Sequence, residues 1–208
     1  MLRYDISRKL IMNRYLLLLL GLLPATGVLA QTQELSLFGK PFSFELPSGW
    51  KLAASENRAD MVSAEFVPAQ ENLNQWGGLI CVQSFKLSDD SPAAEVFLDG
   101  LAMQYQGSCE GEVSYEKLGD VDTDGHPGFH AILGCSRMPN QHVSMEESRL
   151  FFSTPEGEVG YYRVVSRPGQ LVLMHKSMRG DVFAGQNIPL TPANHSEFIA
   201  SVLPLRLN

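Results

Sequence analysis

Apolar and polar residues alternate along several segments in the first half of the chain. In 42-FSFELP-47 every second residue is apolar, starting from Phe42. The same period of two runs through residues 60–68, where Pro68 ends it, and residues 79–87 follow as a third segment of this kind. A period of two is typical of strands that bury one face. The sequence therefore predicts three strands before residue 88.

A corner follows the first of these strands, in 47-PSGW-50. Pro47 cannot donate a hydrogen bond to a neighbouring strand, and Gly49 tolerates backbone angles that other residues avoid. We predict that the corner is a hinge and that Trp50 folds back onto the sheet, where its large ring is buried. The alternative is an exposed Trp50 that binds a ligand.

From residue 91 onward the period changes to that of a helix. Apolar residues recur at four-residue spacing in residues 93–105, which gives an apolar stripe about three turns long. Ser91 suits the N-cap and Pro92 the first helical position. Gly107 suits a left-handed C-terminal residue. Gly100, inside the stripe, is interpreted as a point of close packing on a sheet.

The second half of the chain returns to strands. The turns 154-TPEG-157 and 167-RPGQ-170 are so short that the strands they join must be antiparallel. A short final helix is predicted with Thr191 as N-cap and Pro192 at its first position, and Pro204 ends it. The predicted strands are residues 113–118, 129–138, 145–153, 158–166 and 171–178.

These patterns predict one α+β domain over residues 31–208. It has about seven strands, and an antiparallel sheet covered by the two helices is the economical way to bury the apolar faces of both. No low-complexity linker or internal repeat divides this part of the sequence.

The N-terminus has the pattern of an export signal. Arg14 precedes an apolar run, Leu16 to Leu23, and Val28 and Ala30 give the small-x-small pattern that signal peptidase accepts. The apolar run is far shorter than the ~20 residues that span a bilayer. We therefore predict a signal peptide in residues 1–30, cleaved after Ala30, and no membrane insertion after cleavage. Residues 1–11 fit an upstream extension of the start site.

Cleavage would make the protein strongly acidic. Residues 1–30 contain four of the 16 Lys and Arg and one of the 23 Asp and Glu, so 12 basic and 22 acidic residues remain, a net charge of −10. Nucleic acid binding depends on Lys and Arg that neutralise phosphates. The composition therefore argues against a nucleic acid partner. The export signal predicts a periplasmic or secreted protein.

The chain has three cysteines, which in an exported protein allow one bridge and one free thiol. We favour a Cys109–Cys135 disulfide, because Cys109 follows the predicted helix and is free to reach a neighbouring strand. Cys81 lies inside a predicted strand, where a lone cysteine usually behaves as a small buried hydrophobe. The two pairings that use Cys81 stay open.

Candidate metal ligands gather in 120-DVDTDGH-126. The spacing begins like a calcium loop, but the twelfth position, which should hold a bidentate acid, is Ala131. The favoured interpretation is an acidic hairpin turn at Asp124-Gly125. His126 and His130, with Asp122, form a second candidate metal site; Pro127 excludes a helix there, but an extended strand would keep both histidines on one side.

Other catalytic patterns are weak. The sequence has no G-x-S-x-G motif, and the cysteine of 107-GSCEG-111 has an acidic neighbour instead of the cation that would activate a thiolate. The segment 179–192, rich in Gly, Pro and Asn, is a candidate for partner contact because long loops are often functional. We predict no catalytic residues and no cofactor.

Two short motifs frame the predicted helix. F-x-F-x-x-P-x-G-W runs from Phe42 to Trp50, and D-G-x-P-G runs from Asp124 to Gly128. With the order of elements over residues 36–205, they resemble the PsbP-like superfamily, which includes the extrinsic photosystem protein, the Mog nuclear-import factors and DcrB-like exported proteins. The resemblance implies an α/β/α sandwich and no catalytic residues, because the members that are understood mainly bind or organise other proteins.

The sequence thus favours an exported, non-enzymatic binding module that recognises a protein or peptide partner of the envelope. One alternative is a small metal-dependent hydrolase that uses Asp122, His126 and His130. Another is a carrier of a small apolar ligand held between the sheet and the helix.

Overall fold

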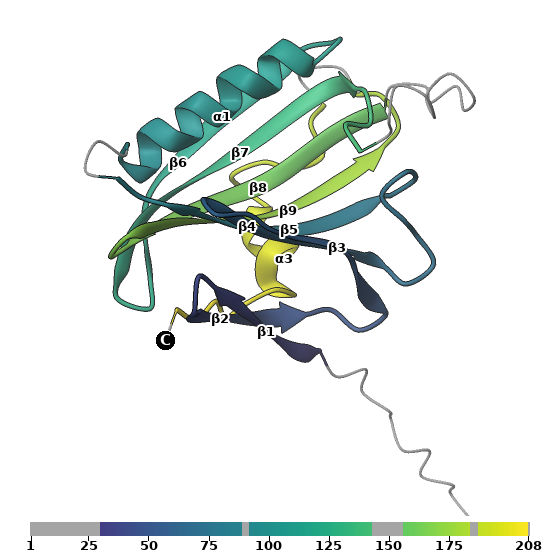
Figure 1. Cartoon of the computed structure of the whole chain (residues 1–208). Helices are drawn as coiled ribbons and strands as arrows, with labels where there is room; N and C mark the ends of the chain where they lie inside the picture. The colour runs from purple at the N-terminus through teal and green to yellow at the C-terminus, as the bar shows by residue number, and fades with distance from the viewer. Residues whose placement is uncertain (1–29, 89–91, 143–155, 184–186, 208) are drawn as a thin grey trace, which may run out of the picture.

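The computed structural model describes residues 30–88, 92–142, 156–183 and 187–207. Within these ranges seven strands form one antiparallel sheet, here called the main sheet, in the order β3-β4-β5-β9-β8-β7-β6 (Figure 1). Its strands are β3 (Trp50–Asn57), β4 (Met61–Pro68), β5 (Gly78–Lys86), β6 (Val113–Thr123), β7 (His126–Met138), β8 (Glu156–Arg167) and β9 (Gln170–Gly180).

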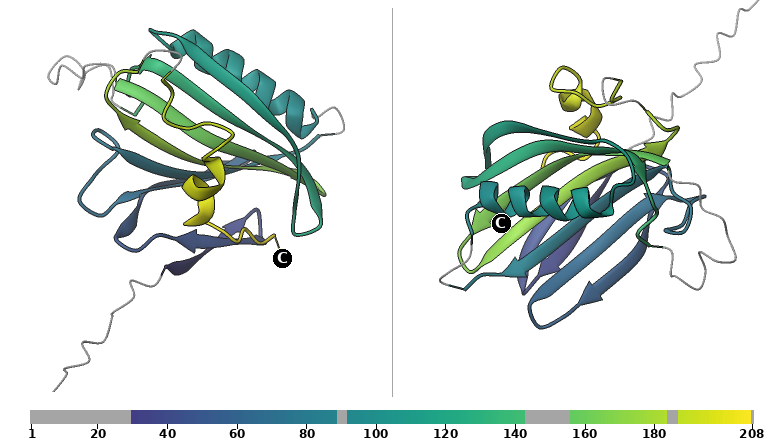
Figure 2. Two further views of the ribbon diagram at one scale, coloured as in Figure 1. Left: turned by 180° about the vertical axis from the view of Figure 1, so that it is seen from behind. Right: turned by 90° about the horizontal axis from the view of Figure 1, so that it is seen from above.

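Both faces of the main sheet are covered. Helix α1 (Ala94–Ser108) lies across one face, over β6, β7 and β8. The opposite face is covered by an N-terminal hairpin of β1 (Gln31–Leu37) and β2 (Lys40–Leu46) and by the short helix α3 (His195–Ala200), as Figure 2 shows from two further sides. The predicted α+β fold, an antiparallel sheet of about seven strands covered by helices, is confirmed for the described residues.

Two hydrophobic cores lie on the two faces of the main sheet, because the side chains of each strand point alternately to one face and the other. On the hairpin side, Phe42, Phe44 and Leu46 of β2 point at the main sheet and are at least 95% buried. On the other side, Leu98 and Ala102 of α1 pack on β7, β8 and β9. Because successive strand residues point to opposite faces, each central strand contributes to both cores.

The corner at residues 47–50 is a turn, as predicted. Gly49 has a φ of +76°, in the left-handed region that favours glycine. Trp50 begins β3 and packs, partly buried, against the hairpin-side core. A Cβ at Gly78 would stand 2.9 Å from the Trp50 ring, so the indole lies directly over that glycine.

The ends of α1 differ from the prediction. The helix begins at Ala94, the first residue that faces the sheet, with Ala93 as N-cap; Pro92 precedes it, and Ser91 lies outside the described residues. Gly107 stays helical, because the chain leaves the helix through an extended Cys109 instead of a left-handed glycine.

Two further expectations about helices are wrong. Nothing lies within 4 Å of the position that a Cβ on Gly100 would take, so this glycine does not mark close packing. The final helix begins at His195, and its N-cap is Asn194, not Thr191. The Asn194 carboxamide accepts a hydrogen bond from the Thr191 backbone N–H at 2.8 Å, and it holds residues 191–194 in a turn before the helix.

Strands β1 and β3 were not predicted, and β6 extends five residues beyond the predicted 113–118. The predicted strand 145–153 lies outside the described residues. In the part of the chain that the structure describes, no helix is both long and apolar enough to cross a bilayer.

Candidate functional site

The acidic segment around Asp124 forms the turn between β6 and β7. Asp124 and Gly125 have positive φ values of 57° and 79°, and the Asp122 carboxylate accepts a hydrogen bond from the Gly125 N–H at 2.9 Å. This confirms the predicted hairpin turn. Asp124 in turn accepts from the Leu207 N–H at 3.0 Å, which attaches the turn to the C-terminal segment.

His130 is held by neighbours that are not metal ligands. Its Nδ1 lies 2.8 Å from the Tyr161 hydroxyl, which also accepts a hydrogen bond from Arg163 Nε at 2.9 Å. Burial, with the charges of Arg163 and His195, lowers the pKa of His130 to about 4. Among the described residues no group of three His, Cys, Asp or Glu side chains is close enough to share a metal ion. The structure therefore does not bring Asp122, His126 and His130 together.

The loop after β9 is largely packed in its described part. Phe183, Ile188 and Leu190 contact the hairpin-side core, while Val182 is 56% exposed. Residues 184–186 lie outside the described residues. The suggestion that the segment 179–192 contacts a partner stays a prediction.

The sulfur atoms of Cys109 and Cys135 lie at bonding distance, 2.05 Å, and Cys81 is free and buried. We expect replacement of both Cys109 and Cys135 by alanine to lower the free energy of unfolding by roughly 3.5 kcal/mol, because the bridge closes a loop of nearly thirty residues. Urea unfolding of the double variant checks this value. A peptide map of the protein that links Cys81 to another cysteine would contradict the pairing.

A pocket of about 250 Å³ lies beside α1, where the helix leaves part of the main sheet uncovered. Its floor is a row of side chains on neighbouring strands: Glu65 of β4, Cys81 of β5, His175 of β9 and Tyr162 of β8. Each of these residues pairs with the next across the sheet, so all four point to the α1 face. Two pairs of consecutive strands, β4 with β5 and β8 with β9, are far apart in the sequence and together build this surface.

The walls of the pocket come from two sides. Leu101, Gln104, Tyr105 and Ser108 of α1 form one wall. The other wall is formed by Trp76 in the connection between β4 and β5, by Met138 at the end of β7, and by Gln141 and His142, which follow β7. The Trp76 and His142 rings meet edge to face with centroids 6.3 Å apart.

The floor is buried but polar. The His175 ring stacks on Tyr162 with centroids 4.7 Å apart, and its Nδ1 lies 3.0 Å from the Ser177 hydroxyl. Burial, with a smaller effect of His142, lowers the pKa of His175 to about 3, so this imidazole is neutral. Burial also raises the pKa of the Cys81 thiol well above its ordinary value, and Glu65 adds to this. Cys81 is therefore a neutral thiol.

Glu158 of β8 closes the inner end of the pocket. The Tyr105 hydroxyl donates to it at 3.3 Å, and Arg179 Nε lies 3.5 Å from its carboxylate. Burial raises the pKa of Glu158 to about 7, although Arg179 and the hydrogen bond from Tyr105 both lower it. This carboxyl therefore changes its charge much closer to neutral pH than an ordinary glutamate does.

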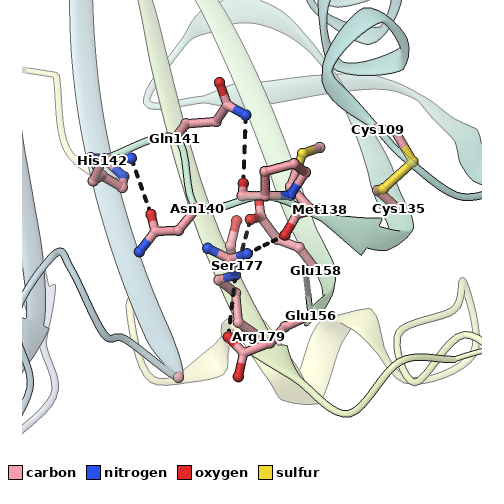
Figure 3. Close-up of polar contacts among 12 residues, drawn as sticks. Cys109, Cys135, Met138, Asn140, Gln141, His142, Glu156, Glu158, Ser177 and Arg179 are labelled. Carbon is pink, nitrogen blue, oxygen red and sulfur yellow. Dashed lines mark hydrogen bonds and ion pairs between the residues drawn. A yellow bond between two sulfur atoms is a disulfide. The ribbon is translucent and has the colours of Figure 1, made fainter. Parts of the chain in front are cut away.

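Arg179 stands behind Glu158 and is not part of the pocket lining. Figure 3 shows its guanidinium between the carboxylates of Glu156 and Glu158 and the backbone oxygen of Met138, to which it donates. It also lies over the Trp76 ring, 5.1 Å from the centroid. Its charge is thus shared between Glu156 and Glu158, of which only Glu158 lines the pocket.

Sequence reasoning missed this pocket because it searched for ligands that are close in sequence. Its signal was a polar residue at an inward position of an otherwise apolar strand. His175 in 170-QLVLMHKSM-178 is such a residue, whereas Glu65 in 61-MVSAEFVP-68 falls with Ser63 on the polar side of its strand. The strand pattern places each side chain on one face of its strand, but only the register of the strands shows that the two side chains meet.

Comparisons with known proteins find likenesses at low sequence identity and leave the function open. No protein-family model matches the sequence, and no curated protein matches it. Among solved structures, the solution structure of cyanobacterial PsbP (CyanoP) from Synechocystis sp. PCC 6803 is similar with a TM-score of 0.48 and 16% identity, over 91% of this chain and 99% of that one.

The Ran-binding protein Mog1p of Saccharomyces cerevisiae is similar with a TM-score of 0.43 and 14% identity, over 85% of this chain and 86% of that one.

Proposed function

We propose that the protein is a non-enzymatic binding module, exported to the periplasm or secreted, that recognises a protein or peptide partner of the cell envelope through the pocket beside α1. The signal pattern of residues 1–30 supports export. The observation that supports binding most directly is the pocket itself, because it combines apolar and aromatic walls with a few polar groups, as ligand sites do.

The size of the pocket favours one side chain of a larger partner. Its volume of about 250 Å³ lies below the roughly 300–1,000 Å³ of sites for drug-sized ligands.

A small apolar ligand, the carrier function considered from the sequence, would occupy the same pocket. Leu79, Leu101 and Leu173 favour it. The carboxyl groups of Glu65 and Glu158 oppose it, because an apolar ligand would remove them from water without offering them a hydrogen bond. Native mass spectrometry of the exported protein, which detects the added mass of a retained ligand, separates the two functions.

The test is affinity capture from the envelope fraction with the exported protein and two tryptophan variants. Gln104 lies on the pocket wall and is exposed, whereas Gln106 is exposed on the same helix and lies outside the lining. We expect Gln104→Trp to fill the mouth of the pocket and to reduce capture of the partner at least tenfold, and Gln106→Trp to leave it unchanged. Equal capture by both variants, or none by the unaltered protein, would reject the proposal.

A further inference from the structure

We propose that the pocket beside α1 accepts a cationic group, an ammonium or guanidinium on an apolar stem, and that a lysine or arginine side chain of the partner supplies it. The chemistry of the pocket is inferred from its lining alone. The identity of the donor as a protein side chain rests on the function proposed above.

The first observation is the balance of charge around the pocket. Glu65 and Glu158 contribute two carboxyl groups, and none of the described residues that line the pocket is Lys or Arg. Arg179 lies behind Glu158, where Glu156 and Glu158 both neutralise it. A cation that enters the pocket on the side of α1 therefore meets the two carboxyl groups before it meets the positive charge of Arg179.

The second observation is the density of aromatic rings. Trp76, Tyr105 and Tyr162 line the pocket together with His142 and His175. Ring faces attract cations, and the attraction grows when water is excluded. The Trp76 ring already receives the guanidinium of Arg179 at 5.1 Å, which shows that the geometry here suits such contacts. The leucines of the lining would contact the apolar stem of a Lys or Arg side chain.

Glu65 is the best anchor for the charged end. Its side chain is 18% exposed, and the His142 Nδ1 lies 3.9 Å from its carboxylate, which is beyond hydrogen-bond distance. The carboxylate is thus held on the floor with room to accept a hydrogen bond. A charge-assisted bond from an ammonium or guanidinium would be stronger than one from a neutral donor.

A third observation favours a peptide over a free amine. Trp76 is 95% buried, and its indole Nε1–H has no hydrogen-bond partner among the described residues. Buried donors of this kind cost free energy until they find an acceptor. A lysine within a peptide brings both a cation and backbone carbonyl oxygens, whereas a simple amine brings the cation alone.

Calorimetric titration of the exported protein tests the proposal with three probes. Nα-acetyl-lysine N-methylamide carries the cation and the carbonyl groups, Nα-acetyl-norleucine N-methylamide lacks the cation, and pentylamine lacks the carbonyl groups. We expect the lysine probe to bind at least tenfold more tightly than the norleucine probe. We also expect proton release near pH 7, seen as an enthalpy that depends on the buffer, because the incoming cation favours the ionised form of Glu158.

Variants locate the site. Glu65→Gln removes the proposed anchor and should weaken the lysine probe roughly ten- to hundredfold. Gln104→Trp should block it independently, should Glu65→Gln fail to fold, and Gln106→Trp should bind normally. Equal binding of the lysine and norleucine probes, or no binding of any probe, would overturn the cation site. The proposed function would still stand if Gln104→Trp reduced capture of the partner and Gln106→Trp did not. If pentylamine binds as tightly as the lysine probe and no partner is captured, the cation site is supported, but the inference that a protein side chain supplies the cation is overturned.

Discussion

Gly128→Ala is expected to lower the free energy of unfolding by about 3 kcal/mol or more, at the upper end of the cost of overpacking a core. A Cβ at residue 128 would stand 2.3 Å from the backbone oxygen of Val164 and 3.2 Å from the Cα of Val165. Both atoms belong to β8, which pairs with β7 at this position. A backbone inside a sheet cannot move aside without breaking its ladder. Urea unfolding followed by circular dichroism measures the loss.

Gly180→Ala is the matched control for this prediction. Gly180 also lies in a strand of the main sheet, but no atom lies within 4 Å of the position that its Cβ would take. Its replacement should change stability by less than about 0.5 kcal/mol. If the two variants unfold at the same urea concentration, close contact with β8 is not the reason for glycine at residue 128.

Gly128 also shows where sequence reasoning ends. In the motif D-G-x-P-G, the role of Gly125 follows from local chemistry, because an Asp-Gly pair predicts the hairpin turn that the structure contains. The role of Gly128 depends on Val164, which is 36 residues away. No local rule reveals that contact. The sequence identifies a glycine, and the register between β7 and β8 explains it.

The same limit separates the strands that were predicted from those that were missed. Strands β2, β4, β5, β8 and β9 bury one or both faces, so their apolar residues give a clear period. Strand β3 lies at the edge of the main sheet and is mostly exposed, and β1 belongs to the separate hairpin, where only its last residue, Leu37, is buried. A strand that buries few side chains does not need alternating apolar and polar residues. The apolar–polar period is therefore weak in strands that pack little against the core.

The pocket illustrates the problem for function. The sequence hypothesis joined His126 and His130, which are close along the chain, and the structure gives His130 a packing role beside Tyr161 and Arg163. Glu65, Cys81 and His175 span more than a hundred residues and become neighbours through two strand registers. Their presence in apolar strands is visible in the sequence, but their convergence is a property of the fold.

Arg179→Met is expected to destabilise the protein by roughly 3–5 kcal/mol at pH 8.5, because it leaves the Glu158 carboxylate buried without its cation. The side chains of Arg179 and Glu158 are 2% and 12% exposed, so water cannot replace the lost partner. The carbonyl of Met138 also loses its donor. Urea unfolding at pH 6 and at pH 8.5 measures the effect.

The pH dependence follows from the pKa of Glu158, which burial raises to about 7 in the unaltered protein. A carboxyl whose folded pKa is raised above its unfolded value contributes its full stability below the unfolded pKa, and that contribution is lost as pH rises through the folded pKa. Arg179 lowers the pKa of Glu158, so its removal raises this pKa further. The Arg179→Met variant should therefore lose more stability between pH 6 and pH 8.5 than the unaltered protein does.

The double variant Arg179→Met with Glu158→Gln separates charge from packing. Glutamine stays neutral, so the double variant should recover much of the stability at pH 8.5 and lose the added pH dependence, while the loss at the Met138 carbonyl remains. Arg206→Met is the control for a change at an exposed arginine and should have little effect. If Arg179→Met is equally destabilised at both pH values, and Glu158→Gln restores nothing, then Arg179 acts through packing on Trp76 and not by compensating the buried acid at the base of the pocket.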